Sequence, residues 1–400
     1  MASVPTDRYS AGEQGLGYMY QARFALLQLM RMPESTSLLI EKDDDIDLID
    51  AEGRKTLGSL KHRAEGNRLT DLSTDFWKSV RIWLARYKRD GFALSELQFF
   101  LFTTSKVAER SFLQCFLPGV DAAMPRAALA TEALAETSSA LVLSIREELA
   151  TLDDAQRSDF LSRVLIVENG PRIDELPKII VDHHMRSVRR EFRSHVFERL
   201  EGWWTDQVIN LLTGRRTDPL IGNEVSDKLA LFADEYKADN LPIDFRDAMP
   251  ERPIDELTDP RLFIAQLRAL GSGKESIRYA IIDYYRAYEQ RSMWARQQVI
   301  DSEEIETYED RLVEEWARYR AAILEDLNET SAEASMVAAG RELYRWAQQS
   351  HTHLRIRERV NEPYVARGAF HMLANGRPQP RVHWHPRFLE RLAALLGATE

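Results

Sequence analysis

The sequence contains one cysteine, Cys115, among its 400 residues. A single thiol cannot build a disulfide framework, which excludes the small disulfide-stapled secreted domains and fits a reducing compartment. Its neighbours Phe112, Leu113, Phe116 and Leu117 are all apolar. We therefore predict that this thiol is buried and structural.

Long apolar runs are missing as well. No stretch of about 18 apolar residues occurs, so the sequence predicts no transmembrane helix. The first seven residues lack a basic region followed by an apolar one, so no signal peptide is visible. These absences predict a cytoplasmic protein that does not enter a membrane. A length of 400 residues allows two or three domains, and a hydrophobic content of 44% is typical of a globular chain.

Negative charge outweighs positive charge overall, because 64 Asp and Glu residues against 53 Lys and Arg give a formal net charge of −11. Nucleic-acid binding depends on the local distribution of charge, however. Two stretches carry only basic charges, residues 54–63 and residues 78–89. Basic helices are often only solvated faces, yet contacts with backbone phosphates require such clusters. The candidate DNA-binding residues are Arg63, Lys78 and Arg81.

A group of acidic residues lies between segments whose apolar residues alternate as in β-strands. The apolar run 38–40 leads into Glu41-Lys42-Asp43-Asp44-Asp45, and two further alternating runs follow at 46–49 and 57–61. We predict three strands in a meander. If residues 42–44 form a tight turn, Glu41 and Asp45 are neighbours across the ladder. Ser59 and Lys61 share one face of the third strand, because strand side chains alternate.

This arrangement predicts metal chemistry. Mg²⁺ is bound by oxygen ligands and is usually held by one or two carboxylates with waters. A lysine beside the ion can align the attacking water and balance charge on a phosphate. The candidate ligands of Mg²⁺ or Mn²⁺ are Glu41, Asp45 and Asp44, and Lys61 is the candidate lysine. The alternative is that the acids form an exposed surface turn.

The flanking elements complete a recognisable order. Residues 16–32 have helical periodicity and contain Gln21, which is either solvated or reaches the acids. Residues 75–88 predict a second helix, and residues 97–105 predict a buried strand. The order helix, three strands, helix, strand resembles the αβββαβ core of the PD-(D/E)xK restriction-endonuclease-like proteins. The predicted fold is therefore α+β, with a mainly α-helical C-terminal region.

We predict three regions. Residues 1–115 form the nuclease domain, residues 116–245 a helical middle region, and residues 246–400 a helical region for partner binding or oligomerisation. Within the middle region, residues 160–167 fit either a short strand or a helix-to-loop segment. The Asp/Pro-rich stretch 242–260 is the candidate linker. Five histidines gather in the tail, at 351, 353, 371, 383 and 385, and a zinc or HNH-like site is an alternative there.

Particular motifs carry a closer resemblance. Residues 17–21 (Gly-Tyr-Met-Tyr-Gln), 41–45, 60–62 and 76–78 are similar to the double-stranded DNA endonuclease domain of CBASS effectors. The downstream motifs are similar to the nuclease subunit of Lamassu, or ABC-three-component, anti-phage systems: Gly202-Trp203-Trp204, residues 283–287, residues 290–294, residues 367–374 and Trp384-His385-Pro386. The resemblance spans nearly the full length.

The resemblance implies a function. Gln21, Glu41, Asp45 and Lys61 fall on catalytic positions, with Asp44 competing as the second acid. Ser59 stands where the family usually has Gln or Glu, which leaves one ligand open. Such subunits work with an SMC-like ATPase and a small accessory subunit, are inactive in that complex, and cut DNA after release and self-assembly. Infected cells are thereby sacrificed in an abortive infection. The alternatives are a catalytically degenerate scaffold or DNA-binding subunit, and a helical adaptor.

Overall fold

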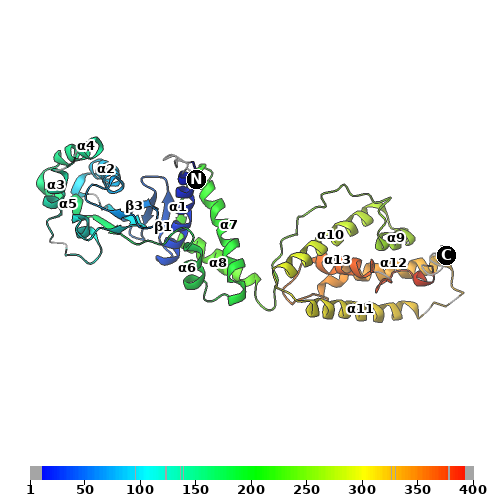
Figure 1. The fold of residues 1–400 in the computed structure, drawn as a ribbon. Helices are drawn as coiled ribbons and strands as arrows, with labels where there is room; N and C mark the ends of the chain where they lie inside the picture. Colours follow the sequence, from blue (N-terminus) through cyan, green and yellow to red (C-terminus); the bar gives the residue numbers. More distant parts are fainter. Residues whose placement is uncertain are drawn as a thin grey trace, which may run out of the picture. The chain divides into compact units, whose positions relative to one another are not determined.

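The chain forms two compact units, Met1–Phe232 and Ala233–Glu400, and each is described here by itself (Figure 1). The computed structural model describes residues 11–391, except residues 95, 122, 123, 136, 138, 326, 329, 377 and 378. Across these residues, none of the helices is both long and apolar enough to cross a bilayer.

The first unit is built on a mixed sheet, to which the described residues contribute six strands in the order β7-β5-β3-β2-β1-β8. The strands are β1 (Ser37–Ile40), β2 (Ile46–Ile49), β3 (Lys55–Lys61), β5 (Gln98–Thr103), β7 (Val164–Val167) and β8 (Leu220–Ile221). β8, β1, β2 and β3 pair antiparallel in turn, whereas β3, β5 and β7 run parallel. Separately, β4 (Arg68–Leu69) pairs with β6 (Lys106–Val107).

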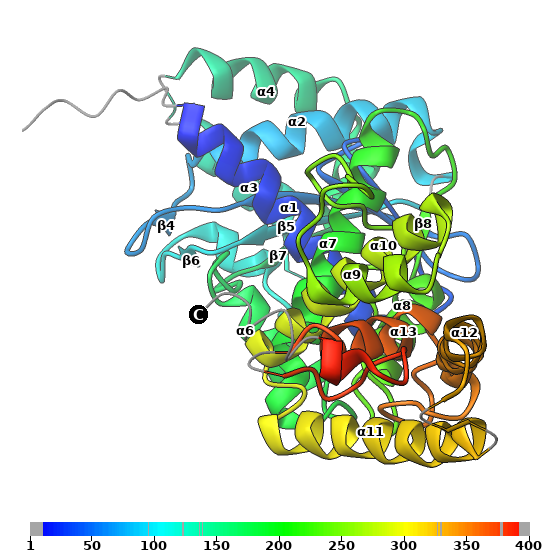
Figure 2. The ribbon, with the colours of Figure 1, turned by 90° about the vertical axis from the view of Figure 1, so that its right-hand side faces the viewer.

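Helices lie on both faces of the sheet. One side carries α2 (Thr74–Arg89), α3 (Arg126–Ala135), α4 (Ala140–Ala150) and α5 (Asp154–Ser162), and the other carries α1 (Ala11–Arg31), α6 (Leu176–His184), α7 (Arg193–Leu212) and α8 (Gly222–Glu235) (Figure 1). α2 and α4 lie side by side (Figure 2). Short 3-10 helices occur at Phe92–Leu94, Phe112–Phe116 and Arg190–Phe192. The sheet is therefore the middle layer of three.

Helix α2 forms because its apolar residues recur at helical spacing and face the sheet. Phe76, Val80, Trp83 and Tyr87 are buried, and the Trp83 ring stacks on Phe99 of β5 at 5.6 Å between centroids. Full burial of each large side chain contributes about 1.5 to 3 kcal/mol. Arginines and a lysine fill the last turn, where they complement the helix dipole. Burial of this face fixes α2 against the sheet.

The predicted order of elements in the first hundred residues is confirmed. The helix predicted at 16–32 is α1, the three meander strands are β1 to β3, the helix predicted at 75–88 is α2, and the strand predicted at 97–105 is β5. Cys115 is buried in the core beneath α2, as predicted. The α+β class is confirmed by this mixed sheet with its covering helices.

The sheet extends beyond the region predicted as its domain. β7 and β8 come from residues 116–245, which were predicted as a helical region with a strand left open only at residues 160–167. A run of four apolar residues such as Val-Leu-Ile-Val fits a strand or a buried helical turn equally well, so periodicity alone does not decide it. β8 is only two residues long and gives no periodic pattern at all. Long-range pairing with β5 and β1 decides both cases.

Gly58 allows β3 to pass between its neighbours. A Cβ atom at this position would lie 2.7 Å from Ile46 Cγ1 and 3.1 Å from the Phe102 ring. A side chain would therefore push β3 away from the residues that pack on it. The absence of a side chain here keeps Gly58 paired with Ile46 of β2 and keeps the following residues, Ser59 to Lys61, in register with β5.

The second unit is helical in its described part. Its helices are α9 (Leu262–Ala269), α10 (Lys274–Arg296), α11 (Ser302–Leu324), α12 (Glu333–Gln349) and α13 (Pro363–Leu373), with a 3-10 helix at Ser350–Thr352. α10 and α13 make the most extensive contact between helices. The predicted linker 242–260 forms no helix or strand, but Gln290 of α10 holds its beginning by accepting from Asp244 N at 2.9 Å and donating to Pro242 O at 3.2 Å.

The carboxyl group of Asp283, on α10, predicts how the stability of this unit depends on pH. Burial raises its pKa from 3.8 to about 6, although the positive charges of Arg367 and Arg286 oppose the shift. The folded state therefore holds this proton more tightly than the unfolded chain does. The free energy of unfolding falls as pH rises from about 4 to about 6 because of this group.

We expect Asp283→Asn to be more stable than wild type at pH 7.5, by on the order of 1 to 3 kcal/mol, with the difference vanishing near pH 4. Denaturant unfolding followed by circular dichroism at both pH values measures it. Asp310→Asn, which changes an exposed carboxylate of α11, is the control. Its free energy of unfolding should differ from that of wild type by less than about 1 kcal/mol at either pH. Equal stability of Asp283→Asn and wild type at pH 7.5 would contradict the expectation.

Candidate functional site

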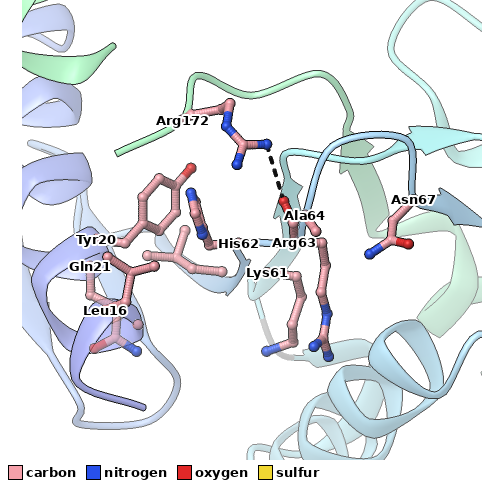
Figure 3. Close-up of a pocket in the computed structure, with 11 residues that line it drawn as sticks. Leu16, Tyr20, Gln21, Lys61, His62, Arg63, Ala64, Asn67 and Arg172 are labelled. Carbon is pink, nitrogen blue, oxygen red and sulfur yellow. Dashed lines mark hydrogen bonds between the residues drawn. The ribbon is translucent and has the colours of Figure 1, made fainter. Parts of the chain in front are cut away.

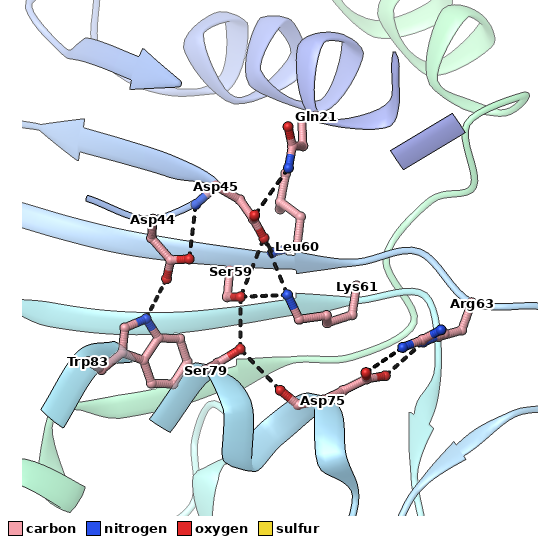
Figure 4. A network of polar contacts seen from close by, with 10 residues as sticks. All are labelled: Gln21, Asp44, Asp45, Ser59, Leu60, Lys61, Arg63, Asp75, Ser79 and Trp83. Carbon is pink, nitrogen blue, oxygen red and sulfur yellow. Dashed lines mark hydrogen bonds and ion pairs between the residues drawn. The ribbon is translucent and has the colours of Figure 1, made fainter. Parts of the chain in front are cut away.

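Three of the four residues predicted as catalytic meet at one end of β2 and β3 (Figure 4). Asp45 immediately precedes β2, and its Oδ2 lies 3.4 Å from Nζ of Lys61, the last residue of β3. Gln21 of α1 donates from Nε2 to Asp45 Oδ1 at 3.1 Å. The backbone N–H of Leu60 donates to Asp45 Oδ2 at 2.5 Å. The Asp45 carboxylate and the Lys61 ammonium therefore point to the same side of the sheet.

Ser59 lies inside this network. Its hydroxyl accepts a hydrogen bond from Lys61 Nζ at 2.8 Å and lies 3.4 Å from Asp45 Oδ2. The Ser79 hydroxyl of α2 donates to the Ser59 hydroxyl at 2.8 Å and connects the network to that helix (Figure 4). Ser59 is almost fully buried. The serine thus positions the lysine.

Asp44 lies beside the network and faces α2. Its Oδ2 accepts from Trp83 Nε1 at 2.5 Å, and its Oδ1 accepts from the backbone N–H of Asp45 at 2.9 Å. Burial, together with the negative charge of Asp45, raises the pKa of Asp44 to about 6. The two neighbouring carboxyl groups of Asp44 and Asp45 are half-buried and repel each other, and the nearby cations do not fully balance their negative charge. A cation placed near them would be favoured.

Glu41 occupies the predicted backbone position. Ile40 pairs with Ile46, and the Glu41 N–H donates to the Asp45 carbonyl at 3.1 Å, so the two residues are neighbours across the turn. The Glu41 backbone has a φ of 54°, and its side chain is exposed. Within the described residues, no hydrogen bond or ion pair joins the Glu41 carboxylate to Asp45 or Lys61. The structure therefore brings Asp45, rather than Glu41, to the lysine.

The remaining acids of the turn belong to an ion-pair cluster that sequence reasoning missed. Lys55 binds Asp43 and lies 2.7 Å from Asp47 Oδ2, while Arg86 of α2 lies 2.9 Å from Asp43 Oδ1. Asp47 is fully buried. Its position in the alternating pattern of β2 was the available signal, since a carboxylate inside a sheet needs a cationic partner. This cluster fixes the hairpin, and neither Lys55 nor Arg86 pairs with Asp44 or Asp45 in the described structure.

The predicted DNA-binding cations differ in their surroundings. Arg63 forms an ion pair with Asp75 at the start of α2 (Figure 4). Arg81 lies 3.1 Å from Glu148 of α4. Lys78 is exposed and, within the described residues, has no ion pair. Much of the basic charge of α2 is therefore already compensated inside the unit, which the local count of charges did not reveal.

The donor set fits a hard divalent cation. The Oε1 atom of Gln21 is buried and has no hydrogen-bond partner in the described structure. It lies on the amide whose Nε2 binds Asp45, and Asp44 supplies a second carboxyl group nearby. The described residues contain no group of three or more His, Cys, Asp or Glu side chains arranged for a metal. Mg²⁺ requires fewer, because waters commonly complete its coordination.

Three of the five tail histidines are packed in the second unit, whereas His351 is half-buried and His353 is exposed. His371 is fully buried against Phe263 and Tyr344, and burial lowers its pKa to about 3. His383 packs against Trp316, and His385 pairs with Glu333 at 3.2 Å. These side chains therefore serve as core residues in the described structure and are not gathered into a zinc-like cluster.

A cavity of about 440 Å³ opens beside Lys61 (Figure 3). Tyr20, His62 and Arg172 line it. Tyr20 and His62 lie in the motifs quoted at residues 17–21 and 60–62, whereas no predicted motif contains Arg172. Arg172 comes from the connection after β7 and donates to the carbonyl of Arg63, 109 positions earlier. No local pattern in the sequence indicates a contact over that separation.

Among solved structures, a Cap4 SAVED/CARF-domain containing receptor of Acinetobacter baumannii with the cyclic trinucleotide 3'3'3'-cAAA is 13% identical, with a TM-score of 0.32 over 59% of this chain and 46% of that one. The Moraxella osloensis Cap4 receptor is 12% identical, with a TM-score of 0.32 over 66% of this chain and 61% of that one. The chain thus spans about half of the length of these receptors.

No curated protein matches the chain. Residues 263–392 match the family described as C-terminal domain 7 of the ABC-three component (ABC-3C) systems. This range begins in α9, ends beyond α13 and contains most of the helical core of the second unit. The match places the protein in the context of the ABC-three component systems.

Proposed function

We propose that the protein is a metal-dependent DNA endonuclease that acts as the effector of an ABC-three component anti-phage defence system. One observation carries the proposal. Asp45 and Lys61 converge at 3.4 Å on one side of the sheet, and Gln21 and Ser59 hold them there. A carboxylate and an ammonium group at the mouth of a basic cavity suit the hydrolysis of a phosphodiester.

Asp45 and Asp44 would hold Mg²⁺ or Mn²⁺ together with waters. When bound, such an ion supplies positive charge to the phosphate and a more acidic water. The protein's own contribution is orientation. Gln21 Nε2 and the Leu60 N–H fix the two oxygens of Asp45, so this carboxylate does not have to reorganise during the reaction.

Lys61 has the second role. Its ammonium is anchored by the Ser59 hydroxyl at 2.8 Å, which leaves further N–H donors of the same group for the substrate. We assign these donors to a phosphate oxygen and to the attacking water. Ser79 and α2 support Ser59 from behind, so the position of the lysine depends on the packing of that helix.

The partners follow from the C-terminal domain. Its match supports membership of a multi-component system, in which we assign an SMC-like ATPase and a small accessory subunit as the subunits that keep the nuclease inactive. After release, the protein assembles with further copies and degrades double-stranded DNA. The exposed Lys78 contributes to contacts with the phosphate backbone.

A second candidate is a catalytically degenerate DNA-binding scaffold of the same complex. The exposed side chain of Glu41 and the serine at position 59 favour it, since both positions then lack a carboxylate at the metal.

Incubation of the purified full-length protein with supercoiled plasmid separates the two. We expect nicked and linear products with Mg²⁺ and none with EDTA, and no products from Asp45→Asn under either condition. DNA binding without Mg²⁺-dependent cutting by the wild-type protein would select the scaffold.

A further inference from the structure

The cavity beside Lys61 has an unusual charge for so acidic a chain. Among the described residues that line it, three are cations, Lys61, Arg63 and Arg172, and none is an acid. The other lining groups are apolar or neutral polar side chains such as Tyr20 and Asn67 (Figure 3). A cavity of this composition favours an anionic ligand.

Its position in the fold also points to a ligand. The parallel strands β3, β5 and β7 end at this edge, where ligands of open sheets commonly bind. After β7, the chain turns back across the edge: Gly170 N donates to the Thr103 carbonyl at 2.9 Å. A Cβ at Gly170 would lie 3.2 Å from that oxygen, so the glycine permits the close approach. This turn brings Arg172 to the cavity.

Arg172 differs from the other arginines near the site. Its guanidinium donates to the Arg63 carbonyl at 3.4 Å and, among the described residues, has no carboxylate partner. Arg63 is paired with Asp75, and Arg81 is paired with Glu148. A guanidinium has several N–H donors in a planar fork that suits phosphate oxygens. Most of the donors of Arg172 are therefore available to a ligand.

Two rings support the segment that carries Arg172. The Tyr20 hydroxyl donates to the Pro171 carbonyl at 3.1 Å, and the Tyr20 and His62 rings lie 4.8 Å apart. Ile173 N donates to His62 Nε2 at 3.5 Å. The backbone on both sides of Arg172 is thus held in place, which is what a preformed binding site requires.

We propose that the cavity is a phosphate subsite for the DNA strand being cut, in which the Arg172 guanidinium binds the phosphodiester next to the one at Lys61. The subsite rests on the proposed function only in taking DNA as the ligand. Lys61 lines the cavity and also contacts Asp45, so one DNA strand can run from Lys61 to Arg172. Arg172 binds substrate here and takes no part in proton transfer.

Binding without cleavage tests this subsite. Fluorescence anisotropy of the full-length protein with a labelled duplex oligonucleotide in EDTA, over a series of NaCl concentrations, gives the affinity and its salt dependence. We expect Arg172→Ala to weaken binding by about tenfold and to lower the slope of log K against log [NaCl] by about 1. Arg172→Lys keeps the charge and should restore the slope.

Arg54→Ala is the matched control, because Arg54 is an exposed arginine at the opposite end of β3, paired with Asp50. This substitution removes one positive charge, as Arg172→Ala does, and its DNA-binding affinity should stay within about twofold of the wild-type affinity. If the folded Arg172→Ala variant binds DNA with the affinity and salt dependence of wild type, the subsite is overturned, even where the wild-type protein cuts plasmid. A loss of affinity in Arg172→Ala, together with a wild type that binds but never cuts, supports the subsite and removes the nuclease assignment.

Discussion

Lys61→Ala is expected to lower the rate of Mg²⁺-dependent plasmid cleavage by about 10³-fold, the usual effect of removing one preorganised donor at a developing charge. The ammonium group is held by Ser59 and lies beside Asp45, so its removal takes away a positioned donor and leaves the carboxylate in place. Initial rates of nicking with protein in excess over DNA measure the effect.

The fold should tolerate this change. Lys61 is partly exposed, and its ion pair with Asp45 is long, so we expect a loss of less than about 1 kcal/mol in the free energy of unfolding. Lys178→Ala, which removes an exposed lysine of α6, controls for the loss of one positive charge and should cleave at the wild-type rate. A nicking rate of Lys61→Ala equal to that of wild type would remove Lys61 from the mechanism.

Gly368→Ala is expected to destabilise the second unit by about 3 kcal/mol or more. Gly368 lies on α13 where that helix crosses α10. A Cβ there would lie 2.3 Å from the Cβ of Ala287 and 2.3 Å from the Asp283 carbonyl oxygen. Backbone atoms cannot move aside as a flexible side chain would, so the two helices would have to separate.

Thermal unfolding followed by circular dichroism measures this prediction. A loss of 3 kcal/mol corresponds to a fall in Tm of about 6 to 12 °C for a unit of this size. Gly202→Ala is the control, because nothing lies within 4 Å of a Cβ at that position in α7. It should stabilise by about 0.5 to 1 kcal/mol through helix propensity. An unchanged Tm in Gly368→Ala would show that the helices do not pack as closely as described.

The same contact explains why two distant motifs were informative in the sequence. Residues 283–287 and 367–374 were both quoted for the resemblance to an ABC-three-component subunit, and they face each other as α10 and α13. The match to the C-terminal domain family, at residues 263–392, includes both segments. Tight helix crossings constrain residue size on both partners, which leaves a recognisable pattern in each segment.

Much of the candidate site was predictable because strand geometry is local. The alternation of side chains placed Ser59 and Lys61 on one face, and the tight turn at 42–44 placed Asp45 at the start of the next strand. Gln21 was also singled out as a residue that either reaches the acids or is solvated, and it reaches Asp45. The choice among the acids was not predictable, since four of them follow one another within five positions.

The sequence by itself determined the elements of the first hundred residues and placed Lys61 beside the acids of residues 41–45, because both depend on patterns within about twenty residues. Tertiary structure decided the rest. Lys55 and Arg86 neutralise Asp43, Glu41 turns to solvent, and Arg172 reaches the site from beyond β7. These outcomes depend on contacts between distant segments, and residue spacing along a chain does not specify which distant segments meet.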